Sequence, residues 1–120
     1  MMKKEKTIVD DNLKEFESGA VRSADSDHAR YDLIPYAGLE LLGRTLKHGA
    51  DRYGEFNWQK GIPQSDLINH AMQHLVKWGA GDRSEDHIGH CLANLCFLAH
   101  FCFDEVDKIY RTESAIQAVT

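Results

Sequence analysis

Apolar residues recur at helical spacing in three segments of this chain, separated by stretches that are rich in glycine, proline and charge. In the first segment Leu39, Leu42 and Leu46 follow one another at intervals of three or four residues, which predicts a helix over residues 35–47. Gly49 comes directly after Lys and His, a combination that often ends a helix. We therefore expect the first helix to end just before this glycine.

Two longer segments carry the same periodicity. Residues 64–78 show an apolar stripe, and residues 84–109 are apolar on nearly every side between Cys91 and Phe103, as expected of a central helix. The stripe of the second segment consists of Leu67, Ala71, Leu75 and Trp78. No strand-like alternation of useful length is present. The pattern thus predicts an all-α fold, a small helical bundle.

The two ends of the chain lack this pattern. Residues 1–28 are polar and charged with few large apolar groups, and we expect them to form a flexible N-terminal arm. A chain of 120 residues has the size of one domain. We expect that all-α domain over residues 29–112, followed by a C-terminal tail at 113–120.

Residues 49–63, between the first two predicted helices, combine helix-breaking residues with aromatic ones. Three glycines and a proline interrupt helical structure there. Three aromatic rings favour packing of the segment against the rest of the protein. The rings belong to Tyr53, Phe56 and Trp58. We expect an ordered loop whose rings either cap the core or contact a ligand, and the sequence leaves both uses open.

Charge and composition exclude several classes of protein. The 14 basic and 19 acidic side chains give a formal net charge of -5, which offers no basic surface for duplex nucleic acid. The longest apolar run, residues 92–103, is shorter than the roughly 20 residues of a membrane span, and residues 1–6 lack the apolar segment of a secretory signal. The three cysteines have no C-x-x-C spacing, so reduced, buried thiols are expected. We expect a cytoplasmic protein without a membrane partner.

Five of the seven histidines fall in the second and third predicted helices. His70 and His74 are four residues apart and share one helix face, and His87, His90 and Asn94 share another. Imidazoles and carboxylates on facing helices can assemble a divalent-metal site in a helical bundle. The metal candidates are Glu40, His70, His74, Glu85, Asp86 and His90, with His87 as a further candidate in the same stretch. They cannot all be ligands.

Other catalytic motifs are missing from the sequence. There is no H-E-x-x-H of a zinc protease and no His-Asp pair of the common metal phosphohydrolases. A P-loop and a G-x-G-x-x-G fingerprint are also absent, and no Ser or Cys nucleophile stands beside a base. Any nucleotide would have to be bound by another scaffold, without covalent catalysis.

Six short motifs occur in the order and with the spacing of a known family. They are Gly19-Ala-Val-Arg22, Arg30-Tyr-Asp-Leu-Ile-Pro35, His48-Gly-Ala-Asp-Arg-Tyr-Gly54, Asn57-Trp-Gln-Lys-Gly61, His74-Leu-Val-Lys-Trp78 and Asp86-His-Ile-Gly-His90-Cys-Leu-Ala-Asn94. Over residues 18–104 the chain resembles the largely phage-encoded dATP/dGTP diphosphohydrolases, relatives of the MazG-like pyrophosphohydrolases. The resemblance implies an all-α, metal-dependent, oligomeric enzyme that hydrolyses a deoxypurine nucleoside triphosphate to its monophosphate and pyrophosphate. Such an enzyme would control the nucleotide pool of a phage in the host cytoplasm.

The chain departs from the MazG-like pattern at the metal site. That wider group carries E-x-x-E on one helix and E-x-x-D on the next. Here His70 and His74 occupy the place of the first motif, and residues 85–90 occupy the place of the second. The metal assignment therefore rests on the facing-helix argument.

The chemistry we expect is in-line attack of water on the α-phosphorus, assisted by one or two Mg²⁺ or Mn²⁺ ions. Glu40, Asp86 and His90 would hold metal or orient water. Phosphate charge would be neutralised by Arg22, Arg30 and Lys47. The substrate's base and sugar would be contacted by Tyr53, Asn57, Trp58 and Asn94, because a ring offers a face and an amide can satisfy a base edge.

Two alternatives to this activity remain open. One is a non-catalytic helical module that binds a metal or a nucleotide, and the other is a triphosphohydrolase that releases tripolyphosphate. The sequence also predicts self-association, because a helix that is apolar all round in so short a chain needs a further partner to cover it. We expect a homodimer or a homotetramer.

Overall fold

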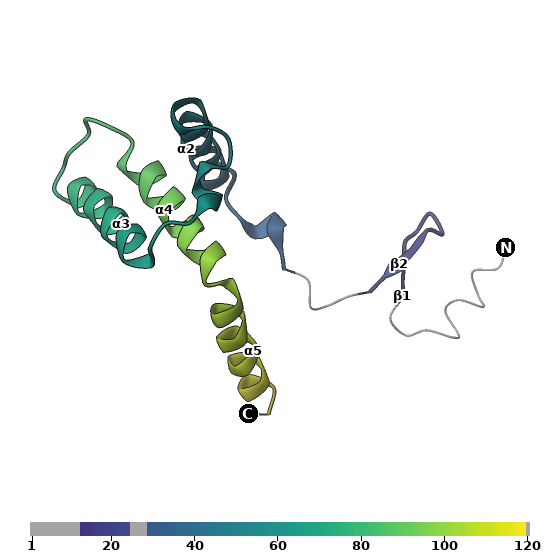
Figure 1. Ribbon diagram of the computed structural model, residues 1–120. Coiled ribbons are helices and arrows are strands. Elements are labelled where there is room, and N and C mark those ends of the chain that lie inside the picture. Colours follow the sequence, from purple (N-terminus) through teal and green to yellow (C-terminus); the bar gives the residue numbers. More distant parts are fainter. Residues whose placement is uncertain (1–12, 25–28, 120) are drawn as a thin grey trace. The chain divides into compact units, whose positions relative to one another are not determined.

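The computed structural model of the chain describes residues 13–24 and 29–119, and the chain divides between Ile34 and Pro35 into two units (Figure 1). In the first unit β1 (Leu13–Glu15) and β2 (Val21–Ser23) form an antiparallel pair with Leu13 opposite Ser23. Gly19 permits the tight connection because its φ is +93°, a value that glycine adopts without a steric penalty. The sequence pattern did not predict this hairpin. Residues 1–12 and 25–28 of the expected N-terminal arm lie outside the described residues.

The remaining elements are helical, which confirms the all-α fold class. A short 3-10 turn, η1 (Tyr31–Leu33), ends the first unit. The second unit holds α2 (Tyr36–Tyr53), the 3-10 turn η2 (Asn57–Lys60), α3 (Gln64–Gly79), α4 (His87–Phe101) and α5 (Phe103–Val119). The hairpin is the only sheet in the described ranges.

The first helix is longer than the sequence predicted. α2 passes through Gly49 and ends at Gly54, whose φ is +98° and whose N–H donates to the carbonyl of Ala50 at 2.9 Å. A glycine in a helix interior costs only about 1 kcal/mol relative to alanine. The Lys47–Asp51 ion pair, 2.8 Å long and four residues apart, spans the expected stop and supports the added turn. The prediction that Gly49 ends the helix was therefore wrong.

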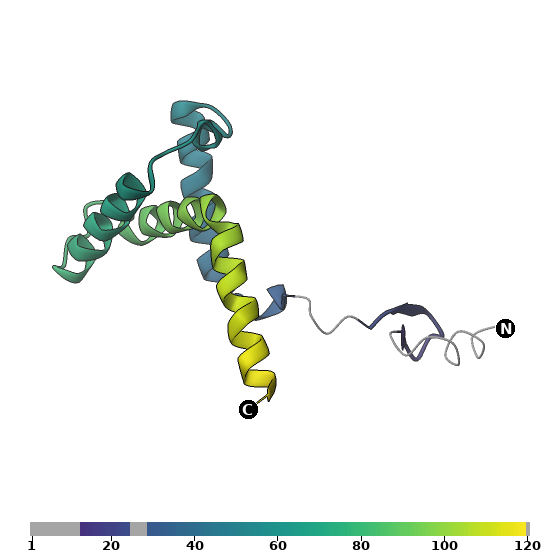
Figure 2. The same cartoon turned by 60° about the horizontal axis from the view of Figure 1, so that its bottom comes forward.

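The third predicted helix is two helices. α4 starts at His87, where the Asp86 carboxylate caps it by accepting a hydrogen bond from Gly89 N at 2.8 Å. It ends at Cys102, whose Sγ donates to the carbonyl of Leu98, and a side-chain bond of this kind competes with the helical ladder. α5 then runs away from the other helices in both views (Figure 2). It extends through Val119, so residues 113–119 of the expected tail are helical.

The core lies where α3 packs against α4, the most extensive helix contact in the second unit (Figure 1). Leu67 and Ala71 of α3 and Cys91 and Ala93 of α4 are its buried apolar residues. The other two members of the predicted stripe, Leu75 and Trp78, are 55% and 38% exposed, so their assignment to the core was wrong. The reason is that, among the described helices, α3 packs extensively only against α4, and the side chains that face α4 are the ones covered. The expectation of buried thiols fails for Cys96, which is exposed.

Gly89 allows α2 to approach the first turn of α4. A Cβ atom at this position would collide with the Asp86 carboxylate and with the hydroxyl of Thr45 on α2. Glycine is therefore required here by close packing. This contact places the middle of α2 beside the N-terminal end of α4.

Leu67→Ala should lower the free energy of unfolding by about 2–5 kcal/mol, because Leu67 is 1% exposed and its truncation leaves a cavity between α3 and α4. The measurement is urea unfolding followed by circular dichroism. Leu39→Ala is the matched control, since Leu39 is 46% exposed and its truncation should cost about 1 kcal/mol or less. Equal losses in both variants would contradict this location of the core.

Candidate metal centre and adjoining pocket

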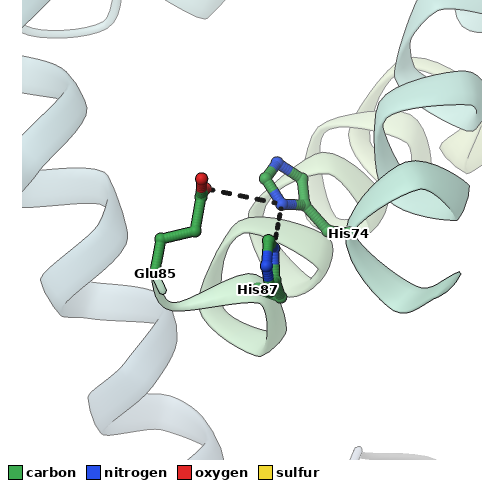
Figure 3. Close-up of side chains that lie close together, drawn as sticks. All are labelled: His74, Glu85 and His87. Atoms are coloured by element: carbon green, nitrogen blue, oxygen red, sulfur yellow. Dashed lines mark hydrogen bonds and ion pairs between the residues drawn. The ribbon is translucent and has the colours of Figure 1, made fainter. Parts of the chain in front are cut away.

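Three potential metal ligands meet at the N-terminal end of α4 (Figure 3). His74 comes from α3, Glu85 from the loop that precedes α4, and His87 from the first residue of α4. The two Nδ1 atoms are 2.9 Å apart, and Oε1 of Glu85 lies 3.7 Å from Nδ1 of His74. We call these three residues the His-Glu-His cluster. It is the group of metal-capable side chains found within the described part of the chain.

The loop between α3 and α4 holds Glu85 by backbone and side-chain hydrogen bonds. Gly81, with φ of +95°, turns the chain after α3, and Asp82 N donates to the carbonyl of Lys77 at 3.0 Å. The Arg83 guanidinium lies 3.4 Å from the centre of the Trp78 ring and donates to the carbonyl of Trp78 at 2.8 Å. The loop is therefore fixed against the last turn of α3, which keeps Glu85 near the two imidazoles.

His87 has no exposed side-chain surface, so both ring nitrogens need partners inside the protein. Nδ1 faces His74, and Nε2 lies 3.1 Å from Oδ2 of Asp82, close but without the direction of a hydrogen bond. Hydrogen bonds from Ser84, followed by the contact with His87, lower the pKa of the Asp82 carboxyl to about 2. Asp82 is consequently a carboxylate at neutral pH, next to the buried ring.

His74 is neutral at neutral pH and can offer a lone pair. Partial burial is the main cause that lowers the pKa of its imidazole, and the neighbouring His90 adds to the effect. Two ligands bound at about 2.1 Å from one ion are separated by roughly 3.0–3.4 Å in octahedral or tetrahedral geometry. The 2.9 Å and 3.7 Å separations in the cluster are near that range. The cluster therefore has the donor chemistry for a divalent ion, and its three donor atoms all lie within 4.8 Å of one another.

His90 belongs to the surroundings of the cluster and also to a pocket. Its ring stacks on His74 with centroids 4.8 Å apart and planes 18° from parallel, and its Nε2 lies 3.9 Å from Oε1 of Glu85. On its other side His90 lines a cavity of about 420 Å³. Pockets of this size accommodate small organic ligands.

The pocket lies between the second half of α2, the loop with η2, and α4. It is lined by four residues that the sequence analysis predicted to bind substrate, namely Tyr53, Asn57, Trp58 and Asn94. Asn94 donates from Nδ2 to the carbonyl of His90 at 2.8 Å, which fixes its amide on the pocket wall. A second hollow, of about 610 Å³, is lined by α5 alone and therefore lacks an opposite wall.

Trp58 fastens the loop to α4. Its ring stacks on Phe97 with centroids 5.3 Å apart and meets His100 and Phe101 edge-on. Phe56, just before η2, has φ of +58°, a backbone conformation that is uncommon outside glycine. The loop is thus ordered as expected, and its rings both cover α4 and line a pocket. Packing against the helical unit is thus observed, and contact of these rings with a ligand stays a prediction.

The other metal candidates have different neighbours. Glu40 pairs with Arg44 at 2.9 Å on the exposed side of α2, and exposed His70 lies 3.7 Å from Asp66, its neighbour one turn earlier on α3. Asp86 is the cap of α4. None of the three belongs to the His-Glu-His cluster. The structure thus brings together His74 and Glu85 with His87, while His90 stacks alongside.

Two of the three basic candidates pair with a carboxylate nearby in the sequence. Lys47 pairs with Asp51 on α2, and Arg30 forms two 2.8 Å hydrogen bonds with Asp32. Arg22 lies in β2, and both arginines belong to the first unit. Their predicted contact with phosphate stays a prediction.

Sequence reasoning missed Asp82 and Phe97. Asp82 follows the second predicted helix in a stretch without a recognisable motif, and its position beside His87 depends on the course of the loop. The apolar pattern assigned Phe97 to a central helix, without a role in a site. In the structure Phe97 lines the pocket and stacks on Trp58. The spacing of His90, Asn94 and Phe97 along one helical face was the available signal.

The fold and the site together define an all-α domain with a potential metal site next to a pocket of ligand size. Residues 18–109 match the family described as dATP/dGTP diphosphohydrolase, N-terminal. The chain belongs to this family. A search of curated proteins and a search of solved structures each found no match.

None of the described helices is long and apolar enough to cross a membrane.

The metal-free protein should lose stability as the pH falls below about 6.5. The folded state lowers the pKa of His74, so the unfolded chain binds this proton more readily, and the stabilisation present above pH 6.5 is lost below it. His74→Gln should flatten this dependence, measured as urea midpoints between pH 5 and 8 with a chelator present. An unchanged slope in the variant would contradict the environment assigned to His74.

Proposed function

We propose that this domain hydrolyses dATP or dGTP to the monophosphate and pyrophosphate in a metal-dependent reaction, as part of nucleotide-pool control in a phage. The observation that carries the proposal is the position of His90, which stacks on the His-Glu-His cluster and lines the pocket. A nucleotide whose base and sugar occupy the pocket would direct its phosphates toward the cluster. Membership of the dATP/dGTP diphosphohydrolase family supports this choice of substrate and bond.

The reaction consumes one water. Its oxygen attacks the α-phosphorus, the bond from that phosphorus to the bridging oxygen of the β-phosphate breaks, and pyrophosphate leaves with the electron pair. The water's protons pass to the solvent and the products. A divalent ion in the cluster, Mg²⁺ or Mn²⁺ in the simplest form of this proposal, would supply positive charge that offsets the developing charge on the phosphates.

Residues of the His-Glu-His cluster and residues of the pocket would have different roles. His74, Glu85 and His87 hold the ion, and His90, at the border with the pocket, orients water or phosphate. Tyr53 is 60% exposed and therefore available to stack on a base. Asn57 and Asn94 offer amides for hydrogen bonds to the base or the sugar. Catalytic roles for Glu40 and Asp86 are less well supported, because each side chain already has a structural partner.

The test is incubation of the protein with each of the four deoxynucleoside triphosphates and Mg²⁺ or Mn²⁺, with chromatographic resolution of nucleotide and phosphate products. Monophosphate and pyrophosphate in equal amounts from dATP or dGTP are expected. His74→Asn should lower kcat about 100-fold or more, because loss of a ligand should cost at least as much as loss of its outer partner. Gln73→Asn, at the neighbouring exposed position of α3, is the matched control and should retain activity.

Other products would contradict the proposal in distinguishable ways. Nucleoside and tripolyphosphate would identify a triphosphohydrolase. Nucleotide binding without turnover, with every substrate and metal, would identify a binding module.

We further propose that the domain is a homodimer or a homotetramer. Four apolar side chains of α3, Ile68, Met72, Leu75 and Val76, form one exposed stripe at helical spacing. A similar exposed set on α5 comprises Val106, Ile109, Tyr110 and Ile116. Another copy of the chain would cover these surfaces, and this matches the self-association that the sequence predicted.

Light scattering after size exclusion should give two or four times the chain mass of 13.6 kDa. Met72→Lys should shift the protein toward the monomer, because a charge cannot be buried there without a partner. Gln73→Lys adds the same charge beside the stripe and should leave the mass unchanged. A wild-type mass of one chain would reject self-association.

A further inference from the structure

We propose that the His-Glu-His cluster selects a first-row transition-metal ion over Mg²⁺, and that Asp82 is the positioning residue that orients His87 for this purpose. The inference deepens the proposed function, because it concerns the ion that the same site would use. It can be tested without any nucleotide, so a failure of this inference can be distinguished from a failure of the proposed hydrolytic activity.

The donor set favours a transition metal. The cluster offers two imidazole nitrogens and one carboxylate oxygen. Mg²⁺ binds oxygen ligands almost exclusively and keeps several waters, whereas imidazole is a suitable ligand for Fe²⁺, Ni²⁺, Cu²⁺ and Zn²⁺. A site in which nitrogen supplies two of three protein ligands therefore discriminates against Mg²⁺.

Burial makes the nitrogen donors rigid. His87 is fully buried and His74 is 19% exposed, so neither ring can turn freely into solvent. Their Nδ1 atoms converge at 2.9 Å, a separation that without an ion requires one nitrogen to donate a hydrogen to the other. With an ion present, both lone pairs would point at it. The two nitrogens are thus held close together before metal binds, and an ion would displace the hydrogen between them.

Asp82 favours one arrangement of hydrogen on His87. Its Oδ2 lies 3.1 Å from Nε2 without the direction of a hydrogen bond, and the negative charge at that distance favours hydrogen on Nε2. The lone pair is then on Nδ1, which faces His74. A ligating histidine whose other nitrogen contacts a carboxylate is a common way for proteins to orient a ligand and raise its basicity.

The exposed side of the cluster leaves room for further ligands. Glu85 is 49% exposed, in contrast to the buried His87. Three protein ligands with an open side are typical of catalytic metal sites, in which water or substrate completes the coordination. An ion bound here could therefore contact phosphate oxygens as well as protein.

Co²⁺ is the most informative probe, because its visible absorption reports nitrogen ligation. The full chain, treated with a chelator and then dialysed, should bind one Co²⁺ per chain with visible bands. A 100-fold excess of Mg²⁺ should leave these bands in place. His74→Asn should abolish them, whereas His70→Asn, which alters an exposed histidine one turn away on α3, should retain them.

Asp82→Asn tests the positioning role. An asparagine can still accept the hydrogen bond from Ser84 N, so the loop is preserved while the charge next to His87 is removed. Co²⁺ and Zn²⁺ affinity should fall about 10–100-fold with an unchanged circular dichroism spectrum.

Several results would overturn the inference. Displacement of Co²⁺ by an equal concentration of Mg²⁺ would reject the selectivity, and retention of the bands in His74→Asn would place the metal elsewhere. Equal affinities of Asp82→Asn and wild type would reject the role of Asp82. If Co²⁺ does not bind but Mg²⁺ supports release of pyrophosphate, the hydrolytic function stands and this inference fails.

Discussion

Burial of His87 at the start of α4 is the constraint on which the rest of the helical unit depends. A polar ring without solvent contact is tolerated only if the surrounding structure supplies polar neighbours. His74 on α3 forms a hydrogen bond with Nδ1 of His87, and the Asp82 carboxylate in the intervening loop lies 3.1 Å from Nε2. These contacts require α3, the loop and α4 to adopt one arrangement. The same arrangement buries Leu67, Ala71, Cys91 and Ala93 between the helices, so core and site form together.

α4 links the His-Glu-His cluster to the pocket. His87 and His90 lie in its first turn, Asn94 one turn later and Phe97 one turn beyond, and the helix changes from polar to apolar along that face. Gly89 lets α2 approach closely enough for its second half to form the opposite wall. Trp58 stacks on Phe97 and closes the pocket from the loop. One helix thus supplies both an ionic end and an apolar end, as a nucleotide requires.

Side chains of the same chemical type serve different purposes because of their partners. Glu40 is neutralised by Arg44 and Asp86 caps a helix, whereas Glu85 lies beside two imidazoles. His70 is exposed one turn from His74, although both lie on the predicted polar stripe of α3. Spacing along a helix specifies which residues share a face, but it does not specify which neighbouring element that face meets. Candidate lists drawn from spacing therefore included residues that do not belong to the cluster.

The sequence by itself determined the all-α class, the limits of α3, the ordered aromatic loop and the family, because apolar periodicity, turn residues and short motifs are local properties. Tertiary structure decided the end of α2, the break at Cys102, and the meeting of His74, Glu85 and His87. Each of these depends on contacts between residues that are distant in sequence or on competition between nearly equal local preferences. Gly49 and Gly54 could each end α2 on local preference alone. Contacts with the surrounding chain decide that the helix ends before Gly54.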